Sequence, residues 1–151
     1  MNNYTPKIHP ALFIIATILI ILFFYTAVSK LLDMAEFRKQ LANQTLPAWS
    51  IGPLLWIIPI CELLVSALLT MSSTRLIGFY LSTVLMFIFT VYMGLVLSNI
   101  FDRIPCSCGG VLSSMGFVAH FFFNLFFLTL SIVGIYISHA QRKGGPVSVS
   151  D

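Results

Sequence analysis

The first feature of this sequence is how little charge it carries. Of its 151 residues only 9% are Asp, Glu, Lys or Arg, whereas 58% are hydrophobic. A soluble domain of ordinary composition is about 25% charged, so this chain lacks the polar surface that water requires. Its formal net charge of +3 is not gathered into a basic run, which argues against a nucleic-acid-binding surface. The composition therefore predicts a protein whose solvent is lipid.

Cysteine is also scarce, and we find no internal repeat or low-complexity tract. Three cysteines are too few for a disulfide scaffold. Two of them, Cys106 and Cys108, stand in one short segment, RIPCSCGG, whereas Cys61 lies within an apolar run. Two thiols within a single loop indicate a site of thiol chemistry in that loop.

Four apolar segments are long enough to cross a hydrocarbon core of about 30 Å, which needs about 20 helical residues. They cover residues 10–32, 51–71, 76–101 and 115–138. The first exceeds the ~7–15 apolar residues of a signal peptide, so we keep it as a helix. The sequence thus predicts an all-α integral membrane protein, in which residues 1–140 form a four-helix bundle and residues 141–151 a disordered tail.

The connection between the first two spans predicts a short amphipathic helix. Asp33 followed by Glu36 makes a capping-box pattern, and Met34, Phe37 and Leu41 recur at helical spacing. We expect this helix to lie at the membrane surface, in contact with lipid. It shares one side of the membrane with the cysteine loop, and both termini share the other. Basic residues are balanced between the two sides, so charge does not decide the orientation.

Polar residues at similar depths interrupt the spans. Ionisable groups within a membrane are costly and usually face the bundle interior. Counting along the helices puts Glu62 roughly 15 Å, His120 roughly 8 Å and Asn124 roughly 13 Å below the cysteine side. Tyr25 and Tyr92 come out at comparable levels. We predict an interior polar pocket with Glu62 and His120 as catalytic candidates and Tyr25, Tyr92 and Asn124 as candidates for binding a cofactor.

Each of these residues also has a purely structural interpretation. Asn124 can serve only to hydrogen-bond and pack between helices, and His120 can be an interior histidine whose hydrogen bonds are made within the protein. Glu62 can bond the backbone that Pro59 frees by kinking its helix. Cys61 is predicted to be a small apolar filler. The residues alone leave both interpretations open.

The Cys106-Ser107-Cys108 segment permits several kinds of chemistry. A bent CxC just reaches the Cα separation of about 4.4–6.8 Å that a disulfide needs, and a ring this small is strained and easily reduced. Structural zinc requires four ligands, and only Cys106, Cys108 and His120 are available, so we assign no metal ligands. Cuprous copper accepts two thiolates. A redox pair is favoured over a copper site and over an inert loop.

Three stretches of the chain resemble the MauE branch of the DoxX-like membrane proteins: FFYTAVSKLLDMAEFRKQL, CELLVSALL, and PCSCGG before GFVAHFFFNLFFL. The resemblance implies a redox-associated four-helix protein, similar in layout to thiol oxidoreductases such as DsbB and vitamin K epoxide reductase. It also implies a link to methylamine utilisation and to the maturation of a disulfide-rich exported dehydrogenase subunit. This chain departs from those oxidoreductases in having CxC rather than CxxC, and one obvious cysteine pair rather than two.

Residues and resemblance together predict thiol–disulfide exchange by Cys106 and Cys108 on the extracytoplasmic side of a bacterial inner membrane, with both termini cytoplasmic. The expected partner is a thioredoxin-like or other exported thiol protein, and a quinone near His120 and Glu62 is the candidate electron acceptor. Two alternatives stay open. One is a non-catalytic factor that anchors a partner, and the other is a copper-handling protein that uses the same thiolates.

Overall fold

The computed structural model describes residues 10–44, 46–98 and 116–143. These residues form five helices: α1 (Pro10–Leu32), α2 (Met34–Ala42), α3 (Ala48–Thr70), α4 (Arg75–Leu97) and α5 (Phe117–Lys143). The described part of the chain contains no strand. All but α2 are long and apolar enough to cross a membrane. The predicted all-α architecture with four spans and one short intervening helix is therefore confirmed.

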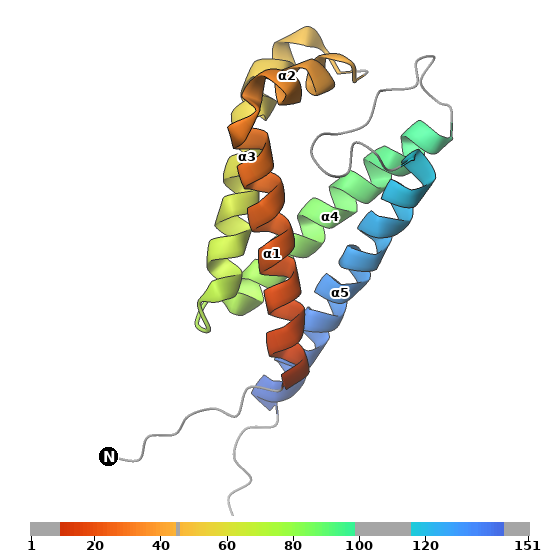
Figure 1. Cartoon of the computed structure of the whole chain (residues 1–151). Helices are drawn as coiled ribbons and strands as arrows, with labels where there is room; N and C mark the ends of the chain where they lie inside the picture. Colours follow the sequence, from red (N-terminus) through yellow and green to blue (C-terminus); the bar gives the residue numbers. More distant parts are fainter. Residues whose placement is uncertain (1–9, 45, 99–115, 144–151) are drawn as a thin grey trace, which may run out of the picture.

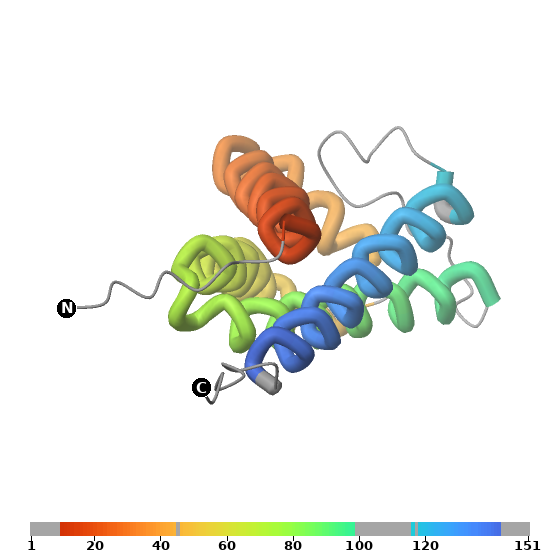
Figure 2. Tube along the Cα trace, turned by 90° about the horizontal axis from the view of Figure 1, so that it is seen from below, coloured from red at the N-terminus to blue at the C-terminus, as the bar shows by residue number. Residues whose placement is uncertain are grey.

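The four spans associate as two pairs, α1 with α3 and α4 with α5 (Figure 1). The pairs lie close together at the end that holds the turn between α3 and α4, and they diverge toward the end that carries α2. In Figure 2, α1 and α3 are seen nearly end-on, whereas α4 and α5 run obliquely across the view. The candidate site lies between the two inclined pairs, next to α2.

A continuous apolar core joins the pairs where they are close. Leu19 and Phe23 of α1, Val65 and Leu69 of α3, and Phe79 of α4 are each at most 1% exposed. Lipid tails are as apolar as these side chains, so association in a membrane depends on close packing and on hydrogen bonds between helices. The core therefore stabilises the association of the helices through close packing rather than by removing apolar surface from water.

Small residues bring α4 and α5 into close contact within this core. A Cβ added at Gly134 would lie 2.3 Å from the ring of Phe79, so only glycine fits there. Ser82 and Ser131 share a buried hydrogen bond of 2.7 Å between the two helices. These contacts make α4 and α5 a tightly packed unit that fixes the direction in which α5 approaches the site.

The short helix α2 forms as its sequence predicts, with half of the capping box. The backbone N–H of Glu36 donates to Oδ1 of Asp33 at 3.0 Å, whereas the N–H of Asp33 donates to the carbonyl of Ser29. The apolar side of α2 is buried through Phe37 and Leu41, and both side chains line the pocket described below. α2 therefore packs against the bundle where the helix pairs diverge.

The observed helix bounds differ most from the predicted ones at the C-terminal end. The last span was expected over residues 115–138, and α5 runs from Phe117 to Lys143. It thus continues into the segment expected to be a tail. The remaining residues of that segment, 144–151, lie outside the described part of the chain.

Candidate functional site

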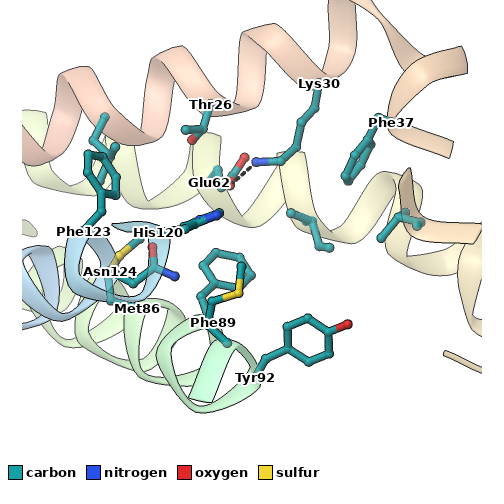
Figure 3. A pocket seen from close by; sticks show the side chains of 14 residues that line it. Thr26, Lys30, Phe37, Glu62, Met86, Phe89, Tyr92, His120, Phe123 and Asn124 are labelled. Atoms are coloured by element: carbon teal, nitrogen blue, oxygen red, sulfur yellow. Dashed lines mark hydrogen bonds and ion pairs between the residues drawn. The ribbon is translucent and has the colours of Figure 1, made fainter. Parts of the chain in front are cut away.

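A pocket of about 110 Å³ lies between the two helix pairs and against α2 (Figure 3). All five helices contribute to its lining. Most of its walls are apolar, from Leu22, Phe37, Leu41, Ile58, Met86, Phe89, Met93 and Phe123. The other lining residues are polar: Thr26, Lys30, Glu62, Tyr92, His120 and Asn124. Such a cavity resembles a small-molecule site, which is usually an apolar cleft with a few polar groups placed within it.

An ion pair that the sequence analysis did not predict forms part of the wall. Nζ of Lys30 lies 2.5 Å from Oε1 of Glu62, and the two side chains are 15% and 2% exposed. A buried carboxylate requires a partner, and here that partner is a lysine on α1 rather than the backbone near Pro59. The Lys30 ammonium also lies 5.8 Å from the centroid of the Phe37 ring, a cation–π distance. The pair thus connects α1, α2 and α3 at the pocket.

The sequence analysis did not identify Lys30 as a pocket residue, because lysines near the end of a span usually extend toward the lipid head groups. A signal was nevertheless present in the spacing of α1. Its buried residues include Leu19, Phe23 and Ala27, and a step of three residues continues this stripe to Lys30. A basic residue on the buried stripe of one span, together with an acidic residue within another, predicts that the two meet.

Two buried polar atoms in the pocket wall have no hydrogen-bond partner among the described residues. They are Oε2 of Glu62 and Nδ1 of His120. His120 is 7% exposed, and Figure 3 shows its ring directed toward the Lys30–Glu62 pair. Leaving a buried polar group without a partner costs about 1–3 kcal/mol, and native structures contain few such groups. These atoms identify the polar end of the pocket.

The residues predicted to bind a cofactor do not all reach this pocket. Asn124 and Tyr92 line it, and the Tyr92 hydroxyl donates a hydrogen bond to Oε1 of Gln44, which follows α2. Tyr25 is 46% exposed and does not belong to the lining. The depth of a residue does not fix the side of the helix on which it lies, and Tyr25 stands opposite the buried Phe23 on α1. The placement of Tyr25 in the pocket is thereby corrected.

The thiol pair itself, Cys106 and Cys108, lies outside the described residues. Its roles in redox or metal chemistry therefore stay predictions. Cys61 carries a free thiol on α3 and is partly buried, and it does not line the pocket. Within the described ranges, no group of three or more His, Cys, Asp or Glu side chains could hold a metal ion.

A family model described as "Methylamine utilisation protein MauE" matches residues 8–137. The match covers α1 to α4, most of α5 and every residue of the pocket. The chain belongs to the MauE family. It is thus a multi-pass membrane protein of a methylamine-utilisation family, and the MauE resemblance predicted from its sequence is confirmed. No curated protein and no solved structure matches the chain.

The pocket of this MauE-family protein brings together a limited set of chemical groups. Lys30 supplies a cation, Glu62 a carboxylate oxygen without a partner, and His120 an imidazole that can hold or release a proton. Asn124 adds an amide that can both donate and accept. This set can hold the polar end of an otherwise apolar molecule and can move protons to or from it, but none of the described lining residues carries a thiol.

Proposed function

We propose that this MauE-family protein performs thiol–disulfide exchange with an exported protein through Cys106 and Cys108. The observation that carries the proposal is the position of this pair in the chain relative to the pocket. Residues 98–105 alone separate α4 from Cys106, and residues 109–116 alone separate Cys108 from α5. Connections this short reach at most about 25–30 Å when fully extended. The thiols are therefore tethered to the two helices that carry Tyr92, His120 and Asn124 into the pocket.

In the proposed reaction, the Cys106–Cys108 disulfide accepts two electrons from a dithiol of the partner. A partner thiolate attacks one of the two sulfur atoms, the S–S bond of the pair breaks, and a mixed disulfide forms. The second partner thiolate then breaks the mixed disulfide. The partner leaves with a new disulfide, while Cys106 and Cys108 hold two thiols. A small CxC ring favours this direction because strained disulfides are the more oxidising ones.

The proposal includes the side of the membrane. α1 begins and α5 ends at the same end of the bundle, and α2 lies at the opposite end (Figure 1). Disulfide chemistry belongs to oxidising compartments such as the bacterial periplasm. We therefore assign the end with α2 and the cysteine pair to the extracytoplasmic face of an inner membrane, and the termini to the cytoplasm. A thioredoxin-like or other exported thiol protein is the proposed partner.

Differential alkylation tests this function. The protein, purified in detergent, is incubated with a reduced thioredoxin, quenched with acid, and labelled with a maleimide before digestion and mass spectrometry. We expect two labels on the peptide that carries Cys106 and Cys108 after the reaction and none on the oxidised starting material. Cys61→Ala serves as the control and should behave as the wild type does.

Two other outcomes would contradict exchange. Thiols that stay reduced under every oxidant would favour an anchoring role without catalysis. Stoichiometric binding of cuprous ion by Cys106 and Cys108, without any disulfide, would favour copper handling.

A further inference from the structure

We propose that the pocket between the helix pairs binds a lipid-soluble quinone, with Lys30, Glu62 and His120 holding one oxygen atom of its ring. This inference rests on the proposed thiol exchange and names the acceptor of its electrons. It also changes the composition of the expected cofactor site, because a lysine on α1 replaces Tyr25.

The number of cysteines requires an acceptor from outside the chain. Each cycle of exchange leaves two electrons and two protons on Cys106 and Cys108. The sequence contains three cysteines, so Cys61 is the one that remains, and a single thiol cannot form a second intramolecular disulfide. The electrons must therefore leave to another molecule. A carrier that dissolves in the bilayer and takes up two electrons with two protons has the chemistry of a quinone.

The polar end of the pocket matches both redox forms of such a ring. A quinone carbonyl accepts hydrogen bonds, and the Lys30 ammonium in the pocket wall is a donor. A hydroquinone hydroxyl donates, and Oε2 of Glu62 is a buried acceptor without a partner among the described residues. Nδ1 of His120 is likewise buried without a hydrogen-bond partner among the described residues. Depending on the tautomer of the ring, this nitrogen can donate to a carbonyl or accept from a hydroxyl. The two unpartnered atoms thus offer hydrogen-bond partners to a ring oxygen in its oxidised and in its reduced form.

The apolar walls suit the body of the ring. Phe89 and Phe123 line the cavity together with Met86, and aromatic and thioether side chains pack well against flat rings. The cavity volume of about 110 Å³ is below the ~150 Å³ of an engineered cavity that binds benzene, so a substituted ring requires the helix pairs to move further apart on binding. A water-filled pocket is the competing occupant, and the binding experiment below separates the two.

The proposed electron transfer balances. The thiols of Cys106 and Cys108 lose two electrons and two protons and form one S–S bond. The quinone gains two electrons and two protons, and its two carbonyl groups become hydroxyls. Glu62 and His120 are placed to exchange protons with the ring oxygen at the polar end, and Lys30 donates to that oxygen and orients the Glu62 carboxylate.

Direct binding of decylubiquinone tests this site without any thiol chemistry. The probe is titrated by equilibrium gel filtration into a Cys106→Ser/Cys108→Ser variant in detergent, and bound quinone is extracted and measured by absorbance. We expect saturable binding of one equivalent. In the same background, Lys30→Met and Glu62→Gln should each weaken binding about tenfold or more, as expected for the loss of a hydrogen bond to a charged group.

The exposed pair on α2 supplies the matched control. Lys39 and Glu36 are 3.7 Å apart with side chains 72% and 50% exposed, so Lys39→Met and Glu36→Gln should leave binding unchanged. If a single pocket variant fails to fold, Lys30→Met/Glu62→Met removes both charges together, and circular dichroism verifies its helix content. Equal uptake by wild type, pocket variants and empty micelles would overturn the proposal. Binding by a protein that shows no thiol exchange would support this site while refuting the proposed function.

Discussion

Lys30 and Glu62 stand 32 positions apart in the chain, and their side chains meet at 2.5 Å where α1 passes α3. A buried ion pair is weak evidence for stability, because desolvation offsets most of the attraction between its charges. Its more certain effect is on orientation. With Oε1 fixed by Lys30, the second carboxylate oxygen is held in the pocket wall at a defined place, which a flexible or protonated Glu62 would not ensure.

Removing one member of this pair should destabilise the protein more than removing both. Lys30→Met leaves the Glu62 carboxylate buried without its cation, and we expect a loss of about 3–5 kcal/mol of unfolding free energy. Lys30→Met/Glu62→Met should recover most of this loss. Reversible unfolding in mixed micelles measures both, with Glu36→Gln on the exposed face of α2 as a control whose change is about 0–1 kcal/mol. If the losses caused by Lys30→Met and by Glu62→Met, each measured alone, add up to the loss in the double variant, the two side chains are not coupled.

Any side chain at Gly134 should destabilise the protein. A Cβ there meets the Phe79 ring at 2.3 Å, so Gly134→Ala should cost about 1–3 kcal/mol through forced movement of α4 from α5. Phe79→Leu in the same molecule should restore part of the loss. Gly52 on α3 has open space around it, and Gly52→Ala should be neutral or stabilising, as for alanine in most helix interiors. Thermal unfolding of the three variants in one detergent gives the comparison, and equal midpoints would contradict the packing argument.

An apolar pattern in the sequence predicts where a span lies in the chain, but not how its helix is rotated against its neighbours. The first span is predicted at Pro10–Leu32 and observed there, because its apolar length alone defines it. Glu62 and His120 are predicted to share a pocket because both lie on inward stripes at related depths. The partner of Glu62 is not predictable in the same way. It depends on the rotation of α1 relative to α3, and this rotation is set by packing between helices that the sequence does not place relative to each other.

The errors have the same physical origin. Tyr25 lies at the expected depth but on the wrong side of α1, since depth and rotation about the helix axis are independent. The end of α5 was placed at Ser138 because apolar residues become fewer there. A helix can nevertheless continue beyond the apolar layer, since its backbone hydrogen bonds do not depend on the surrounding lipid, and α5 runs on to Lys143.

The proposed orientation predicts the accessibility of the thiols. In intact spheroplasts, a membrane-impermeant maleimide should label reduced Cys106 and Cys108, because the proposal puts the loop outside the inner membrane. Cys61 lies within the span α3 and should stay unlabelled until the protein is denatured. Cys106→Ser/Cys108→Ser gives the background. Labelling of the pair only after lysis, with its reduction verified by a permeant reagent, would place the loop in the cytoplasm and refute this topology.

His120 should affect turnover through its proton rather than through its packing. In proteoliposomes with reduced thioredoxin as donor and decylubiquinone as acceptor, His120→Gln should slow turnover about 100-fold or more, the usual size of a general acid–base contribution. Glutamine can still hydrogen-bond the ring but cannot titrate, so binding of decylubiquinone should change far less than the rate. His139 is the matched control, because it lies toward the far end of the same helix, where its Nε2 is 2.8 Å from the Tyr80 hydroxyl. His139→Gln should turn over at the wild-type rate. If the His120→Gln protein is folded and its turnover rate is unchanged, His120 serves only in packing. If rate and affinity for decylubiquinone fall equally, His120 serves in binding alone.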